Sequence, residues 1–125
     1  MKILSASIEL AVSDIEKTLK FYKSIFKNLS IDYQDNIFAS VSINSLDLMF
    51  YKYDEFSKEI PQISRNTLGG TFVIYLNIKD IDKFFNSIKN NVEIIQKLHT
   101  TDYGSKEFAI KDLNGYVLIF SESYK

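Results

Sequence analysis

Short runs of alternating apolar and polar residues recur along the chain, and two longer segments carry apolar residues at helical spacing. Residues 8–12 alternate strictly, which is typical of a half-buried strand. Residues 15–26 instead repeat apolar side chains every three or four positions, with lysines on the other side, which is typical of a helix. Both patterns return in the second half. Together they predict two helices, one ending near residue 27 and one opening at 80–82, and strands at 8–12, 31–33, 37–43, 46–53, 72–78, 92–98, 106–111 and 116–122.

Polar residues mark where these elements begin and end. Ser13 and Glu16 have the spacing of a capping box, which predicts Ser13 as the N-cap of the first helix. Asp80 opens the second helix, and the Asn114-Gly115 pair predicts a tight turn. Residues 54–70 break the pattern and contain the only Pro and the only Arg, so we interpret them as a connector with a short helix near 54–58.

The order strand, helix, three strands occurs twice, which indicates an internal duplication. Residue matches support it: 14–17 with 80–83 at an offset of 66, and 38–39 with 108–109 and 48–50 with 118–120 at an offset of 70. We therefore predict a single domain over 1–125, with module one at about 1–53, the connector at about 54–70 and module two at about 71–125.

Composition excludes several function classes. The 125 residues suit one domain, and a net charge of −1 gives no attraction to phosphate backbones, so we expect no nucleic-acid partner. The absence of Cys excludes thiol catalysis, thiolate metal sites and disulfides, and the single His99 excludes any site that needs several imidazoles. No stretch is apolar enough to span a bilayer, and Glu9 interrupts the apolar start that a signal peptide would need. We expect a cytoplasmic protein with no membrane partner.

Three segments resemble one known family. Residues 12–14 followed by 21–22, residues 78–80, and the run 111–116 are similar to the two half-motifs and the closing Asp-Pro-Asp-Gly-Asn turn of the vicinal oxygen chelate superfamily. This superfamily includes glyoxalase I, the bleomycin-resistance proteins and the extradiol dioxygenases, and the resemblance favours the bleomycin-resistance-like branch. It covers essentially the whole chain. It implies an α+β fold in which two tandem βαβββ modules form an incomplete, cleft-containing β-barrel with the helices packed outside.

The resemblance also implies where a metal would be held. Metal-dependent members hold one divalent ion with four residues, usually His and Glu, and these positions correspond here to Ser7, Met49, Val73 and Ile119. Thioether and hydrocarbon side chains offer no hard donor, and a lone hydroxyl does not hold such an ion. We therefore expect no metal at this site and no cofactor.

Strand alternation predicts which side chains face the cleft, since every second residue of a strand shares a face. The lining is apolar and aromatic with a few polar groups, as in small-molecule pockets. Its two carboxylates, Glu9 and Asp47, favour a cationic or hydrogen-donating ligand, which Tyr51 and Tyr75 would hold by stacking or cation–π contact. The predicted ligand-binding cleft comprises Ser7, Glu9, Asp47, Met49, Tyr51, Val73, Tyr75, Asn77, Val117 and Ile119. The alternatives are that both acids are solvated or paired with Lys, that the two Tyr pack within the sheet, and that side chains fill the cleft.

Two further residues carry chemistry in principle. His99 precedes Asp102 and Gly104, and we interpret it as a solvated loop residue, because nothing nearby supplies a nucleophile. Glu107, beside Lys106, has the pattern of an ordinary exposed strand pair. The 18 Tyr and Phe residues suggest an interface, and we expect a homodimer formed through Tyr51–Tyr53, the connector from Phe56 to Ile63, and Arg65.

The sequence therefore predicts a metal-free protein of the glyoxalase/bleomycin-resistance type that holds a cationic or aromatic small molecule in an aromatic cleft. No catalytic residue is assigned. Two alternatives stay open. One is a glyoxalase-like lyase or dioxygenase-like metalloenzyme with non-standard ligands drawn from Glu9, Asp47, Glu107 or His99. The other is an interaction domain with a filled cleft.

Overall fold

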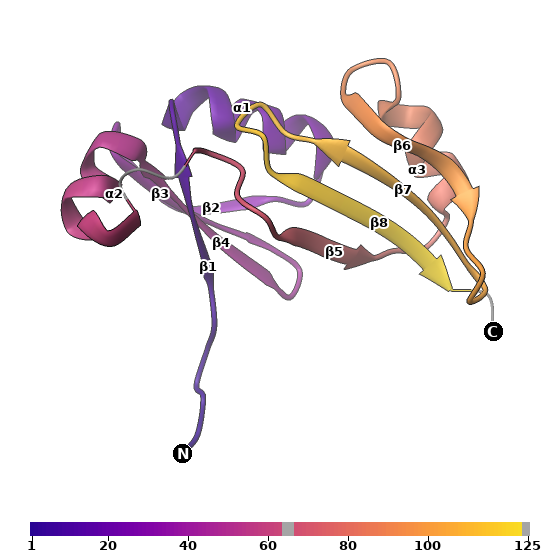
Figure 1. Ribbon diagram of the computed structural model, residues 1–125, viewed down its shortest axis with the longest axis horizontal. Helices are drawn as coiled ribbons and strands as arrows, with labels where there is room; N and C mark the ends of the chain where they lie inside the picture. Colours follow the sequence, from indigo (N-terminus) through magenta and orange to yellow (C-terminus); the bar gives the residue numbers. More distant parts are fainter. Residues whose placement is uncertain (64–66, 124–125) are drawn as a thin grey trace. The chain divides into compact units, whose positions relative to one another are not determined.

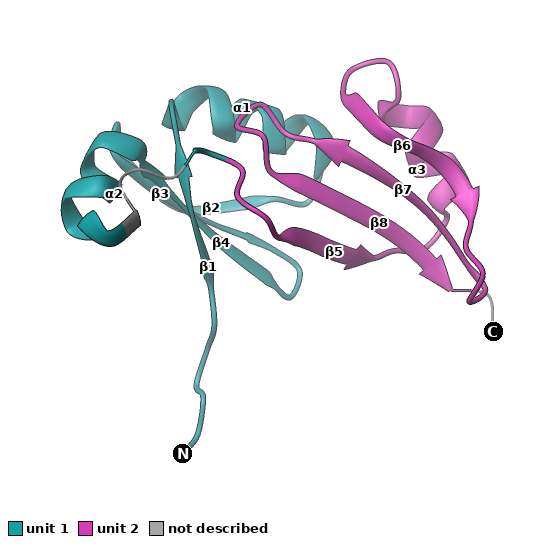
Figure 2. Ribbon diagram, viewed as in Figure 1, with its two compact units in different colours: residues 1–68 teal, residues 69–125 magenta. Residues whose placement is uncertain are grey.

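The computed structural model describes residues 1–63 and 67–123, which belong to two compact units, 1–68 (unit 1) and 69–125 (unit 2) (Figure 2). Each unit contains one four-stranded sheet and one longer helix (Figure 1). Arg65, one of the predicted interface residues, lies outside the described residues. None of the helices in the two described ranges is long and apolar enough to cross a bilayer.

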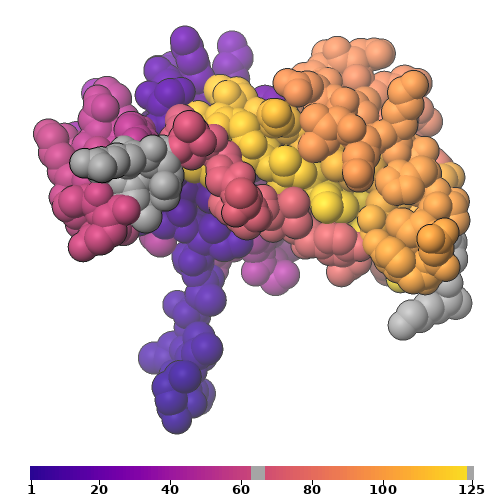
Figure 3. Space-filling view, in the orientation of Figure 1, coloured from indigo at the N-terminus to yellow at the C-terminus, as the bar shows by residue number. Residues whose placement is uncertain are grey.

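Unit 1 consists of a mixed sheet with a helix on one side. Its strands lie in the order β1-β4-β3-β2, with β1 parallel to β4 and the other neighbours antiparallel. Residues 1–7 precede the first strand, are exposed, and stand clear of the rest of unit 1 in the space-filling view (Figure 3). The elements are β1 (Ile8–Val12), α1 (Ile15–Ile25), β2 (Ser30–Gln34), β3 (Phe38–Ile43), β4 (Leu46–Lys52), α2 (Tyr53–Glu59) and a 3-10 turn (Pro61–Ile63).

The core of unit 1 lies between α1 and one face of the sheet. The apolar stripe predicted from residues 15–26 is buried, and the Tyr22 ring packs on Phe50 of β4 at a centroid distance of 5.0 Å. The predicted N-cap is wrong: Asp14, not Ser13, caps α1, and its carboxylate accepts a 2.8 Å hydrogen bond from the Lys17 amide. The helix ends at Ile25, two residues before the predicted end.

Unit 2 repeats the same topology. Its sheet has the order β5-β8-β7-β6, with β5 parallel to β8 and the other pairs antiparallel. Its elements are β5 (Val73–Asn77), α3 (Ile81–Ile88), β6 (Glu93–Thr100), β7 (Ser105–Lys111) and β8 (Val117–Ser123). Both units are βαβββ modules, so the predicted α+β fold with two tandem modules of this order is confirmed.

Phenylalanine dominates the core of unit 2. Phe84 and Phe85 of α3 pack on Phe108 of β7, at 6.1 and 5.0 Å, and Phe108 stacks on Phe120 of β8 at 5.1 Å.

The first turn of α3 is capped by a residue from another strand. Asp80 has a left-handed conformation and makes no side-chain cap, and the Glu122 carboxylate instead accepts the amides of Asp80 and Ile81 at 3.0 and 3.1 Å. The two matched helix starts therefore use different caps.

The duplication holds, but one residue match within it is wrong. Phe50 and Phe120 occupy equivalent helix-facing positions, because each packs against the helix of its own unit. Phe50 pairs with Ala39, whereas Phe120 pairs with Phe108, so Ala39 corresponds to Phe108. The predicted match of 38–39 with 108–109 is out by one residue, and a one-residue slip moves every side chain to the opposite face.

The segment between the modules contains one predicted element. The short helix near 54–58 is present as α2. Gly69 allows a close backbone approach, since a Cβ there would lie 2.7 Å from the Gly115 carbonyl oxygen. The predicted turn at Asn114-Gly115 is present too, and Asp112 stabilises it by accepting the amides of Asn114 and Tyr116 at 2.8 and 2.9 Å.

Candidate functional site

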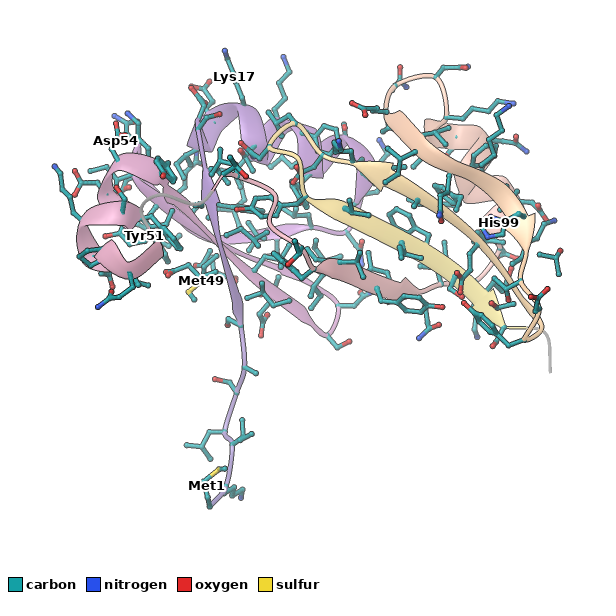
Figure 4. All side chains as sticks on the ribbon, in the orientation of Figure 1. Met1, Lys17, Met49, Tyr51, Asp54 and His99 are labelled. Atoms are coloured by element: carbon teal, nitrogen blue, oxygen red, sulfur yellow. The ribbon has the colours of Figure 1, made fainter. Side chains whose placement is uncertain are left out.

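The face of each sheet opposite its longer helix, called here the open face, carries nine of the ten predicted site residues. In unit 1, Leu10, Leu48 and Phe50 are buried toward α1. Alternation therefore places Glu9, Asp47, Met49 and Tyr51 on the open face. Ser7 precedes β1 and is exposed. Figure 4 shows Tyr51 next to α2 and Met49 on the same strand.

Four aromatic rings follow one another on the open face of unit 1, and we call them the aromatic row. Tyr51 lies edge-on to Phe38 of β3 at 5.7 Å and to Phe56 of α2 at 6.2 Å. Tyr33 of β2 extends the row, at 6.2 Å from Phe38. Tyr33 is 52% exposed and the rings of Phe38 and Tyr51 are half-buried, so these three are partly accessible to a ligand, whereas Phe56 is buried. Sequence reasoning found Tyr51 but not its three partners, because these come from three other elements.

Carboxylates surround Tyr51. Its hydroxyl is hydrogen-bonded to Glu59 of α2; this bond, together with burial and the charges of Glu59, Glu55 and Glu9, raises the pKa of Tyr51. Burial, and then the negative charge of Glu59, raises the pKa of Glu9 as well. The ionised form of Glu9 is therefore disfavoured in the folded protein. A cation bound beside Glu9 would offset both the burial and the repulsion from Glu59.

Asp47 has a different environment. It is half-buried and accepts a 3.0 Å hydrogen bond from the Ser42 hydroxyl, which also lies 2.7 Å from a carboxylate oxygen of Asp32. One hydroxyl hydrogen serves only one acceptor fully at a time. Asp47 is thus tied into the neighbouring strands, and no described contact joins it to the aromatic row.

The open face of unit 2 carries the other predicted residues in three rows across β5 and β8. Val73 pairs with Val117, and Tyr75 pairs with Ile119. Asn77 pairs with Ser121, which in turn pairs with Glu107 of β7. The structure thus brings Tyr75 to an acid, Glu107, that sequence reasoning did not place in the ligand-binding cleft.

Glu107 is the centre of a hydroxyl cluster, and the expectation of an ordinary exposed strand pair is wrong. Its side chain is only 7% exposed. One of its carboxylate oxygens, Oε2, accepts hydrogen bonds from the hydroxyls of Tyr75, Tyr103, Ser105 and Ser121, at 3.1 Å from Tyr103, 3.1 Å from Ser105 and 3.0 Å from Ser121. We call these five residues the Glu107 cluster. Its only sequence signal is that Ser105 and Glu107 share a strand face.

The hydroxyls decide the charge of Glu107. Burial by itself raises the pKa of this carboxyl, but the hydrogen bonds from Tyr75, Ser121, Ser105 and Tyr103 outweigh burial and lower it below its ordinary value. Glu107 therefore stays ionised at neutral pH. The same contact raises the pKa of the Tyr75 hydroxyl, so Tyr75 keeps its proton.

His99 lies on strand β6, not in a loop as predicted, and is exposed as predicted. It is the cross-strand partner of Glu107. Its ring nitrogen Nδ1 lies 2.7 Å from the Lys97 carbonyl oxygen, and since a carbonyl only accepts, Nδ1 is the donor.

The four positions that would hold the superfamily's metal do not fit one. Ser7 offers one exposed hydroxyl, Met49 a thioether, and Val73 and Ile119 only hydrocarbon. Within residues 1–63 and 67–123, no three His, Asp or Glu side chains converge as a metal-binding group. We therefore derive no chemistry through a metal at these positions.

A polar groove of about 290 Å³ lies elsewhere in unit 1 and is lined by none of the ten predicted residues. It is bounded by the start of α1, the β2–β3 turn and the end of β4. Its lining of Asp, Asn, Gln and Lys side chains differs from the apolar and aromatic pocket expected for the ligand.

Comparison with known proteins identifies the family. The model of the Glyoxalase/Bleomycin resistance protein/Dioxygenase superfamily matches residues 5–120, whereas no curated protein matches the chain. The chain is similar to a protein of unknown function from Agrobacterium tumefaciens, with 21% identity and a TM-score of 0.79 over 99% of this chain and 95% of that one. A hypothetical protein from S. aureus shares 23% identity, with a TM-score of 0.79 over 98% of this chain and 95% of that one. A glyoxalase-related enzyme from Fulvimarina pelagi shares 11% identity, with a TM-score of 0.82 over 97% of this chain and 89% of that one. At these identities the neighbours show the fold alone. The chain belongs to the glyoxalase/bleomycin resistance protein/dioxygenase superfamily.

Proposed function

We propose that this protein binds a small aromatic or cationic molecule, without the superfamily's metal, on the open face of unit 1. The observation that carries the proposal is the aromatic row, with ring centroids 5.7–6.2 Å apart, beside Glu9 and Glu59. Aromatic faces attract cations through their quadrupole, and nearby carboxylates add a Coulombic attraction.

The energetics of Glu9 support a binding role rather than a structural one. Burial and the charge of Glu59 both disfavour the ionised form, so at neutral pH the Glu9 charge costs stability rather than supplying it. A bound cation offsets that cost. Binding should therefore weaken as the pH falls through the raised pKa of Glu9, because the protonated acid no longer attracts the cation.

Titration with benzyltrimethylammonium, a cation with an aromatic ring, tests the proposal by NMR of the Tyr and Phe ring signals. Saturable shifts at Tyr33, Phe38 and Tyr51 are expected. Replacement Tyr51→Leu removes one cation–π partner, worth about 0.5–1 kcal/mol at an exposed site, and should weaken binding about two- to fivefold.

The contribution of the Glu9 charge to binding is tested with Glu9→Gln, which should weaken binding about five- to tenfold. Glu93→Gln is the matched control. Glu93 is an exposed acid on β6 of unit 2, so its loss should change nothing. Equal affinity for all three variants, or shifts absent from the aromatic row, would contradict the proposal.

The assembly and location predicted from the sequence remain part of the proposal. Tyr51 and Phe56, two of the expected interface residues, also belong to the aromatic row, so a homodimer formed there would border the ligand. Light scattering at high protein concentration tests the dimer, and cell fractionation tests the cytoplasmic location. A monomer at millimolar concentration would remove the shared-interface idea.

A further inference from the structure

The Glu107 cluster of unit 2 shows an unequal use of one carboxylate. All four hydroxyls reach the same oxygen, Oε2, and within the described part of the chain no donor reaches Oε1. A carboxylate oxygen offers about two lone-pair directions, so four donors on one oxygen exceed what it can accept at once. The other oxygen is left for something else.

Oε1 keeps some contact with solvent, although Glu107 as a whole is only 7% exposed. No buried side-chain nitrogen or oxygen in the described ranges lacks a partner, so an oxygen without one retains contact with water. Tyr75 and Tyr103, whose hydroxyls meet at Glu107, are 46% and 73% exposed. Two partly exposed aromatic rings thus stand around an ionised carboxylate with one oxygen unused.

We infer that the Glu107 cluster binds a primary ammonium group of a small organic molecule. Oε1 accepts one N–H, and the hydroxyl oxygens of Tyr75 and Tyr103, which share Oε2 with the hydroxyls of the two serines, accept the others. The ring faces add cation–π attraction. This site uses only residues of unit 2 and stands independently of the ligand proposed for unit 1.

The geometry discriminates between cations. A guanidinium binds carboxylates best through two parallel hydrogen bonds, one to each oxygen, and Oε2 is already taken by hydroxyls. A primary ammonium is a compact charge with three donors and needs only one carboxylate oxygen. A quaternary ammonium has the charge but no N–H, so it leaves Oε1 without a hydrogen bond.

Two probes with the same chain and charge test this inference, butylammonium and butyltrimethylammonium. Each is titrated into the full chain at pH 7 and followed by the ¹³C shift of the Glu107 carboxyl and by the Tyr75 and Tyr103 ring signals. Butylammonium should give saturable shifts and bind at least about tenfold more tightly than butyltrimethylammonium, because a hydrogen bond to a charged group is lost in the latter.

Variants locate the site. Glu107→Gln should weaken butylammonium about tenfold or more, and Tyr103→Phe, which keeps the ring and loses one acceptor, about threefold. Asp82→Asn is the control, since Asp82 is an exposed acid of the same unit that pairs with Lys106. If Glu107→Gln does not fold, Tyr103→Phe and the two probes still decide the question.

Equal affinity for both probes would overturn the inference, since charge alone would then explain binding. So would butylammonium shifts that survive Glu107→Gln, or no shift at millimolar probe, which would leave the cluster as a link between strands only. Loss of benzyltrimethylammonium binding at unit 1 would not affect it, so the failure of either proposal is recognised separately.

Discussion

Replacing Glu107 by glutamine keeps the shape of the side chain and removes its charge. The change in the free energy of unfolding then measures how much the Glu107 cluster stabilises the fold. Ser105 and Ser121 are 2% and 1% exposed, so their hydroxyls cannot turn to water as those of Tyr75 and Tyr103 can. Besides Glu107, the Ser105 hydroxyl has only the Thr101 hydroxyl beside it, at 2.8 Å, among the described contacts. A hydrogen bond to a charged acceptor contributes about 1.5–3 kcal/mol against about 0.5–1.5 kcal/mol for a neutral one. Two buried donors that each lose about 1 kcal/mol give an expected destabilisation of about 2 kcal/mol at pH 7.

The direction of the pKa shift of Glu107 determines how this destabilisation depends on pH. The pKa of Glu107 is lowered in the folded protein, while an unfolded Glu titrates near about 4.3. The carboxylate therefore stabilises the fold above about pH 4.3, and that contribution is lost as the pH falls through the lower folded pKa. The difference between wild type and Glu107→Gln should shrink from about 2 kcal/mol at pH 7 as the pH falls below about 4.3 and through the lowered folded pKa of Glu107.

Urea unfolding followed by circular dichroism at pH 7, 5, 4 and 3 measures this difference. Asp82→Asn serves as the control, because an exposed ion pair such as Asp82–Lys106 contributes less than about 1 kcal/mol. A Glu107→Gln variant as stable as wild type at pH 7, or a difference that is unchanged at pH 3, would refute the claim that the hydroxyls stabilise an ionised carboxylate.

Three further predictions test other parts of the structure. Glu9→Gln should raise the Tm at pH 7 relative to wild type, with the gap closing as the pH falls through the raised pKa of Glu9; a lower Tm would contradict the account of its charge. Asp112→Ala leaves two amides of the closing turn without their acceptor and should cost about 2–4 kcal/mol in urea unfolding, whereas Asp112→Asn, which keeps one acceptor oxygen, should cost less than half of that. Gly69→Ala places a Cβ at 2.7 Å from a backbone oxygen at φ 102° and should lower the free energy of unfolding by about 2–3 kcal/mol. Gly70→Ala, with nothing nearer than 3.5 Å, should lower it by about 1 kcal/mol. Equal losses for the two variants would contradict the close approach at Gly69.

Local periodicity predicted the strands, the helices and the faces of the strands, because each depends on spacing within one element. Leu10 and Phe50 are buried and Glu9 and Tyr51 lie opposite, as alternation requires. Periodicity could not identify the N-cap of α1, since Ser13 and Asp14 are both good caps and only the backbone conformation at the start of the helix decides between them.

The Glu107 cluster could not be predicted from spacing. It depends on the registers of β5 with β8 and of β8 with β7, and on the β6–β7 hairpin that carries Tyr103. The mismatch of Phe38-Ala39 with Phe108-Ala109 has the same origin: identical letters occur at both places, but only strand pairing shows that they face opposite sides. Side chains that meet across strands are the part of a site that a single sequence specifies least.

The aromatic row illustrates the same limit. Alternation placed Tyr51 on the open face, but Phe56 reaches it only because α2 folds back against the end of β4, and Tyr33 only because β2 lies beyond β3. The composition, with 10 Phe and 8 Tyr, indicated that aromatic contacts would matter without showing where. Three fully buried Phe residues, Phe50, Phe108 and Phe120, lie in the cores under the helices.

The central claim is that this member of the superfamily binds an organic ligand without the family's metal. Native mass spectrometry of the full chain, purified without chelator and then incubated with Ni²⁺, Zn²⁺, Mn²⁺ or Fe²⁺, tests it most directly when repeated with benzyltrimethylammonium and butylammonium. The account predicts no divalent ion retained at one per chain, and a mass shift for each organic cation that is reduced by Glu9→Gln and Glu107→Gln respectively. One tightly held divalent ion per chain, or organic adducts that neither substitution reduces, would contradict it.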